Sequence, residues 1–64
     1  MAEALDAYKK ATEADPRNYL AFNNLGAAYE RQGQREMAIQ NYRRALEINA
    51  ACSDARHNLD RLTR

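Results

Sequence analysis

The sequence predicts an all-α fold of four short helices. Residues that favour helices, above all Ala, Arg, Leu and Glu, make up most of the 64 positions. The β-branched residues, which favour strands, are few: Thr12, Ile39, Ile48 and Thr63. Turn-forming residues gather at 15–18, 32–34 and 49–53, and the segments between them repeat their apolar residues at helical spacing. No strand is expected.

The first helix is expected over residues 2–14 and the second over residues 19–31. Pro16 ends the first helix, because proline has no amide hydrogen and disfavours helical geometry at the preceding Asp15. Gly33, between two glutamines, provides the turn that ends the second helix.

The third helix is expected over residues 35–48 and the last over residues 54–63. The turn between them, 49–53, has neither Pro nor Gly and contains two alanines, so 35–63 could instead fuse into one helix. Opening this turn would let two copies exchange their last helix and form a domain-swapped dimer. Ser53 and Asp54 favour the separate helix instead, since both residue types cap helix starts.

Size and charge exclude several classes of protein. A chain of 64 residues is too small for a large enclosed active site. Ten Lys and Arg against nine Asp and Glu give a net charge of +1 with the signs interleaved, which offers no general attraction to nucleic acid or to an anionic membrane. No apolar run reaches the ~18 residues of a membrane span. Cys52 is the single cysteine and has no internal partner, so we expect a cytoplasmic setting.

The chain repeats itself with a period of 34 residues. Shifting the sequence by that distance aligns seven identical pairs, which fall on helical faces. The pairs are Ala4 and Ala38, Tyr8 and Tyr42, Ala11 and Ala45, Glu13 and Glu47, Ala21 and Ala55, Asn24 and Asn58, and Leu25 and Leu59. Two helices therefore make one repeating unit.

The residues of the central unit resemble those of the tetratricopeptide repeat. Its two signatures are Phe22-x-x-Leu25-Gly26-x-x-Tyr29, with Phe in place of the usual Trp, and Ala38-x-x-x-Tyr42-x-x-Ala45. Pro16 matches the closing proline of the family, whereas Ala50 stands at that place in the central unit. The resemblance implies a helix-turn-helix solenoid fragment of four antiparallel helices. It divides the single domain 1–64 into the second helix of one repeat (1–18), a full repeat (19–52) and a C-terminal capping helix (53–64).

The signature residues are expected to form the core. Gly26 and Ala38 are small enough to let two helices approach closely, and Phe22, Leu25, Tyr29 and Tyr42 are the large side chains between them. In the last helix Ala55, Leu59 and Leu62 form a stripe that can pack backward. The neighbouring stripe, Arg56, Asp60 and Thr63, is polar, as an outer capping face requires, so the sequence favours a natural end of the solenoid here.

The first helix presents residues that have no partner helix of their own repeat. These candidate self-association residues are Ala4, Leu5, Tyr8 and Ala11. Preceding sequence, a second copy of the chain or the bound partner could each cover them. The alternative function is therefore self-assembly into a homodimer, through this helix or through an exchanged last helix.

The resemblance implies a non-catalytic scaffold that binds a protein or peptide on its concave face, which the first helix of each repeat lines. The candidate binding residues on this face are Asn23, Asn24, Ala27, Arg31, His57, Asn58 and Arg61. Asn24 and Asn58 repeat at 34 residues, and each amide can both donate to and accept from a peptide backbone, about three residues apart.

No residue set indicates an enzyme, a metal site or a cofactor. His57 is the only histidine, so a metal site of the usual type lacks a second imidazole. Cys52 and His57 are separated by a predicted helix start, and no third group orients them as a nucleophile and its base.

Overall fold

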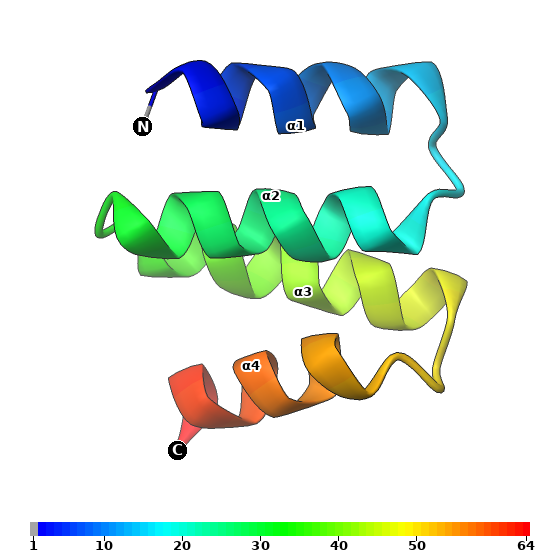
Figure 1. The fold of residues 1–64 in the computed structure, drawn as a ribbon. Coiled ribbons are helices and arrows are strands. Elements are labelled where there is room, and N and C mark those ends of the chain that lie inside the picture. The colour runs from blue at the N-terminus through cyan, green and yellow to red at the C-terminus, as the bar shows by residue number, and fades with distance from the viewer. Residues whose placement is uncertain (1) are drawn as a thin grey trace.

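The computed structural model describes residues 2–64, with side-chain surroundings from Ala4 onward. Four helices follow one another in antiparallel order (Figure 1): α1 (Ala2–Ala14), α2 (Tyr19–Arg31), α3 (Arg35–Ile48) and α4 (Ser53–Thr63). The all-α prediction is confirmed, and only the last helix begins earlier than expected, by one residue. The longest helix has 14 residues, and none in the described range is long and apolar enough to cross a bilayer.

Close approach of α2 and α3 depends on a missing side chain at Gly26. A Cβ atom built there would lie 2.8 Å from Cδ1 and Cε1 of Tyr42 and 3.2 Å from the carbonyl oxygen of Ala38. Carbon atoms in contact normally lie about 3.5–4.0 Å apart. Gly26 is therefore the point at which the ring of Tyr42 meets the backbone of α2, as its small size predicted.

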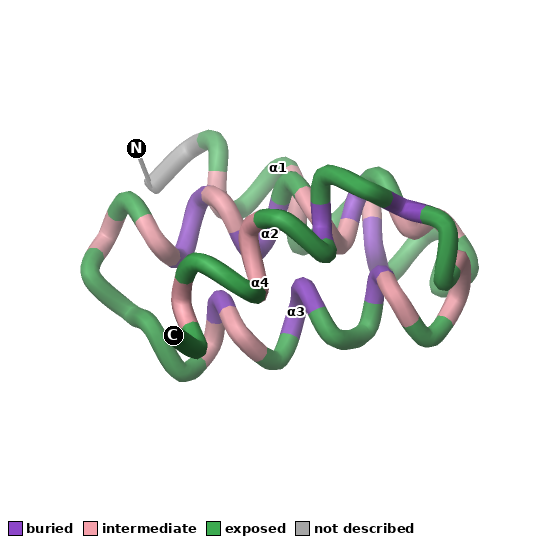
Figure 2. Tube along the Cα trace, turned by 90° about the horizontal axis from the view of Figure 1, so that it is seen from below, coloured by how far each residue is buried: buried purple, intermediate pink, exposed green. Residues whose placement is uncertain are grey.

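The core consists of two clusters of buried residues, and the buried positions of the chain lie mainly on α2 and α3 (Figure 2). The first contains Leu25, Tyr29, Ala38 and Tyr42, and half-buried side chains from α1 and α4 pack against it. The second contains Ala45, Cys52 and Ala55, with Tyr19, Phe22 and Leu46 around them. Tyr42 is the one large side chain of the described residues with no exposed surface, so it is the centre of the fold.

The turns after α1 and α3 have the same hydrogen bonds. In each turn an Asx side chain accepts from the amide two residues later: Asp15 Oδ1 from Arg17 at 3.1 Å, and Asn49 Oδ1 from Ala51 at 3.0 Å. Each Asx carbonyl also accepts from the amide three residues later, at 3.1 and 3.0 Å. α3 and α4 are thus separate, and the fused helix over 35–63 is not the conformation found, because Asn49 makes the turn without a proline.

Candidate functional site

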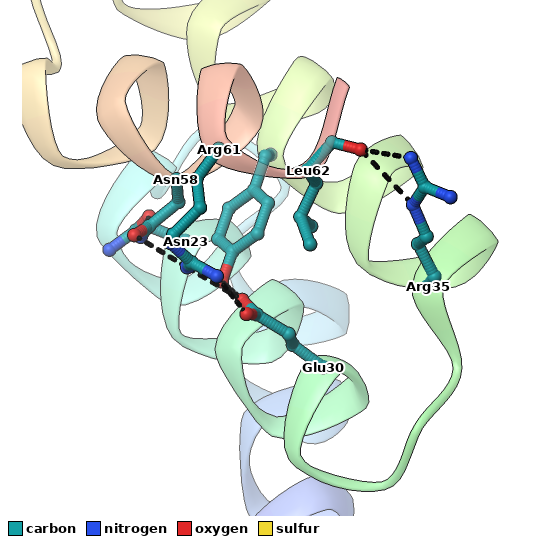
Figure 3. Close-up of polar contacts among 7 residues, drawn as sticks. Asn23, Glu30, Arg35, Asn58, Arg61 and Leu62 are labelled. Atoms are coloured by element: carbon teal, nitrogen blue, oxygen red, sulfur yellow. Dashed lines mark hydrogen bonds and ion pairs between the residues drawn. The ribbon is translucent and has the colours of Figure 1, made fainter. Parts of the chain in front are cut away.

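The seven candidate binding residues all lie on α2 and α4. Three of them, Asn23, Asn58 and Arg61, contact one another (Figure 3). Asn58 of α4 donates from Nδ2 to Oδ1 of Asn23 on α2, at 3.3 Å. Arg61 donates from Nη2 to Oδ1 of Asn58, at 3.2 Å. Both polar groups of the Asn58 amide are therefore engaged within the chain. We call the surface of α2 and α4 that carries the seven candidate residues the α2–α4 face.

Two further residues, Glu30 and Tyr42, complete this polar network. Arg61 binds Glu30 with both guanidinium nitrogens: Nη1 pairs with Oε2, and Nη2 donates to Oε1 at 3.0 Å. The hydroxyl of Tyr42 donates to the same Oε1 at 2.9 Å. Glu30 and Tyr42 were not among the binding residues predicted from sequence. The 34-residue period makes Arg61 equivalent to Ala27, not to a partner of Glu30, so it does not predict this pair.

The network holds its groups in fixed protonation states near neutral pH. The hydrogen bond from Arg61 lowers the pKa of the Glu30 carboxyl below its ordinary value, against the opposing effect of burial. Burial raises the pKa of the Tyr42 hydroxyl well above its usual range, and the hydrogen bond to Glu30 adds to this. Tyr42 therefore stays a donor and Glu30 a charged acceptor, and together with Arg61 they join α2, α3 and α4.

Two hollows flank the exposed side of α2. The first, between α1 and α2, has a volume of about 100 Å³ and is lined by Ala4, Tyr8, Asn24, Ala27, Ala28 and Arg31. The second, between α2 and α4, has a volume of about 290 Å³ and is lined by Ala27, Glu30, Arg31, Tyr42, Asn58 and Arg61. Ala27 and Arg31 line both hollows, so they form the ridge between them. His57 is exposed on α4 and lines neither.

Asn24 and Asn58 differ in their surroundings, although the repeat makes them equivalent. Asn24 is exposed and lines the first hollow, whereas Asn58 is half-buried and bonded to Asn23 and Arg61. The expectation that both amides stand ready for a peptide backbone therefore needs correction. The Asn58 amide is already occupied, and Asn24 is the one that faces an open hollow.

The candidate self-association residues of α1 are only partly uncovered. Leu5 and Tyr8 are half-buried and pack against the core cluster around Tyr42. Ala11 is half-buried and Ala4 is exposed. Leu5 and Tyr8 therefore already pack within the chain. The accessible part of this surface is formed by Ala4 and Tyr8, where they line the first hollow.

Arg35 holds the end of α4 against the start of α3. Its guanidinium donates to the carbonyl oxygen of Leu62 from Nη2 and from Nε, the latter at 3.0 Å (Figure 3). The last carbonyls of a helix have no partner within the helix, so this contact satisfies one of them. Ala55 is buried and Leu62 packs on the core, while Asp60 on the outer stripe is exposed, as predicted.

Several curated proteins that are similar in sequence are much longer than this chain. Protein bimA of Emericella nidulans is 43% identical over 47 residues, which is 73% of this chain and 6% of that protein. The peroxisomal targeting signal receptor of Saccharomyces cerevisiae is 35% identical over 57 residues, 89% of this chain and 9% of the receptor. The receptor of the same name from Kluyveromyces lactis is also 35% identical over 57 residues, 10% of its length. The chain thus spans a tenth or less of these relatives.

Two family models match the chain. The model described as tetratricopeptide repeat matches residues 19–52, and one described as TPR repeat matches residues 1–33. The structure agrees with both matches, since the helix pair α2–α3 packs through Gly26 and Tyr42 and the turns after α1 and α3 are alike. On this evidence, the chain belongs to the tetratricopeptide repeat family.

Proposed function

We propose that the chain is a non-catalytic protein-interaction module that binds a peptide segment of a partner protein on the α2–α4 face. The observation that carries this proposal is the open ridge of α2, where Asn24, Ala27 and Arg31 lie beside two hollows. Family membership and relatives named as targeting signal receptors support a role in protein recognition.

The ridge has the chemistry that a peptide backbone requires. The amide of Asn24 can donate to a peptide carbonyl and accept from a peptide amide at once. Ala27 has only a methyl group, so a backbone can approach the ridge closely. Asn24 and Ala27 therefore recognise the backbone of a bound peptide rather than a particular side chain.

Arg31 adds a preference for an acidic group on the ligand. The ion pairs among the described side chains are Arg44–Glu47 and Arg61–Glu30, so neither includes Arg31. Arg61 has its charge balanced by Glu30, whereas the exposed Arg31 keeps its charge for a ligand. We therefore expect peptides with an acidic side chain near Arg31.

Selection of peptides from a random display library tests this proposal. Enriched peptides are measured by fluorescence anisotropy against the wild type, Asn24→Ala, Arg31→Gln and the matched control Arg43→Gln, which alters an exposed basic residue of α3. Each of the first two variants should bind about 2- to 10-fold more weakly, the effect of one lost hydrogen bond or exposed charge contact. Arg43→Gln should bind like the wild type. Equal binding by the Asn24→Ala/Arg31→Gln double variant would refute the proposal.

A further inference from the structure

The second hollow, between α2 and α4, has more positive than negative charge in its walls. Arg31 and Arg61 line it together with one carboxylate, that of Glu30. Glu30 forms an ion pair with Arg61, whereas neither ion pair of the described side chains includes Arg31. The residues that line the hollow belong to α2, α3 and α4, so its walls are formed within the described chain. Its volume of about 290 Å³ leaves room for a side chain of a ligand.

Arg61 keeps hydrogen-bonding capacity in this hollow although it is paired with Glu30. A guanidinium group has five N–H donors. The contacts of the described residues use three of them: Nη1 pairs with Glu30 Oε2, and Nη2 donates to Glu30 Oε1 at 3.0 Å and to Asn58 Oδ1 at 3.2 Å. The Arg61 side chain is also 43% exposed. Its Nε and the second hydrogen of Nη1 can therefore donate to a second carboxylate beside Glu30.

Glu30 is held in the wall of the hollow and cannot turn away freely. Its Oε1 accepts from the hydroxyl of Tyr42 at 2.9 Å as well as from Arg61, and Tyr42 has no exposed surface. A carboxylate that enters the hollow therefore meets the like charge of Glu30, which repels it. It also meets an Arg61 whose positive charge Glu30 already balances. Both effects weaken the binding of an acidic ligand.

From these contacts we propose that the second hollow binds an acidic side chain of the partner peptide between Arg31 and Arg61, and that Glu30 restrains this binding as an internal counterion of Arg61. The inference rests on the proposed function and makes it more specific. It assigns the acidic residue of the peptide to one hollow, where Arg31 offers its whole guanidinium fork to a carboxylate and Arg61 adds its remaining donors. It also gives one carboxylate of the chain an inhibitory effect on affinity.

A basic side chain is the alternative occupant, and the charges of the hollow disfavour it. Two guanidinium groups and one carboxylate line the hollow, which leaves one net positive charge. Both oxygens of Glu30 already accept from Arg61, and Oε1 accepts from Tyr42 as well. A lysine or arginine of the ligand would compete for these acceptors and lie beside two like charges. The hollow therefore selects an acidic side chain.

Two peptides and two variants of the chain test this inference. The acidic probe is the tightest-binding peptide from the display selection, and the neutral probe is the same peptide with every Asp and Glu replaced by Asn and Gln. Glu30→Gln removes the charge and keeps an oxygen that can accept from Tyr42. The matched control is Glu47→Gln, which makes the same change in the exposed Arg44–Glu47 pair of α3. Affinities are measured by fluorescence anisotropy at a temperature where circular dichroism shows each variant to be folded.

Glu30→Gln should bind the acidic probe about 2- to 5-fold more tightly than the wild type does, because the change removes a like charge and releases the charge of Arg61. The neutral probe should bind both chains equally, and Glu47→Gln should bind each probe like the wild type. A second measurement needs no variant. In the wild type, the acidic probe should shift the side-chain Nε–H NMR signals of Arg31 and Arg61, and the neutral probe should leave them in place.

Three results would overturn the inference: selected peptides without Asp or Glu, a folded Glu30→Gln that binds the acidic probe no more tightly than the wild type, or side-chain signals of Arg31 and Arg61 that do not respond to the acidic probe. If the selected peptides still bind more weakly to the Asn24→Ala/Arg31→Gln double variant, the proposed function stands and only the role of the second hollow is refuted. A library that yields no binding peptide refutes both.

Discussion

Gly26→Ala is the most informative single change for the packing of α2 on α3. The new Cβ would lie 2.8 Å from two ring carbons of Tyr42, about 0.7 Å inside a normal carbon contact. The ring cannot move away freely, because Tyr42 has no exposed surface and its hydroxyl is bonded to Glu30 at 2.9 Å. The methyl group therefore overpacks the core.

Two opposing effects determine how much Gly26→Ala changes the free energy of unfolding. Overpacking of a tight core costs about 1–3 kcal/mol, whereas replacing glycine by alanine in a helix interior returns about 0.8–1 kcal/mol. We expect a net loss of about 1 kcal/mol of unfolding free energy, which lowers the Tm of a domain of this size by roughly 4–8 °C.

Thermal unfolding followed by circular dichroism measures this loss, and a second background isolates its cause. In Tyr42→Leu the ring is absent, so adding Gly26→Ala there should be neutral or stabilising. Gly33→Ala serves as a comparison, because Gly33 has a φ of +77° and no atom within 4 Å of a built Cβ, and its cost arises from the backbone alone. A higher Tm for Gly26→Ala in the wild-type background would refute the close contact.

Three further changes test other parts of the structure. The lowered pKa of Glu30 means that its contribution to stability is present above the ordinary value of 4.5 and is lost as the pH falls through the folded value. The difference in Tm between wild type and Glu30→Gln should therefore shrink on acidification between about pH 5 and pH 2, and a difference that stays constant with pH would contradict the ion pair with Arg61. Arg35→Met removes the contact with the Leu62 carbonyl, so amide hydrogen exchange should become faster in the last turn of α4 and stay unchanged in α2; unchanged exchange in α4 would show that the contact is not maintained in solution. Ala50→Pro places proline where Pro16 stands in the equivalent turn. It should leave the free energy of unfolding unchanged or raise it by up to about 1 kcal/mol, and the Tm should follow. If wild-type chains dimerise by exchanging α4, light scattering should show the mass falling from two chains to one in Ala50→Pro, and a wild type that is monomeric at millimolar concentration excludes that dimer.

The helices and the core could be predicted because local chemistry determines both. Pro16 and Gly33 favour helix ends through their own backbone geometry, and alanine, leucine, glutamate and arginine are frequent in the helices that they bound. Gly26 and Tyr42 were recognisable as core positions because both belong to the repeat signature, but their direct contact is seen only in the structure. The turn at Asn49 was less clear, since Ala50 replaces the proline. Asp15 and Asn49 stand at equivalent places, however, and their side chains make the same turn.

The polar network of the α2–α4 face could be predicted only in part. Which side chains pair across two helices depends on their distance and rotation, and these follow from the packed core rather than from either helix alone. The bonds of Asn58 to Asn23 and of Arg61 to Glu30 are of this kind. The same limit applies to Arg35, whose partner is a backbone carbonyl 27 residues away.

The central claim, that the α2–α4 face binds a peptide, is tested most directly by mapping a bound peptide on the chain. A peptide selected from the display library is titrated into the wild type, and the amide NMR signals are followed residue by residue. The account predicts the largest shifts at Asn24, Ala27 and Arg31, with Asn58 next. Shifts centred instead on the exposed basic residues of α1 and α3, such as Lys9 and Arg43, would contradict it.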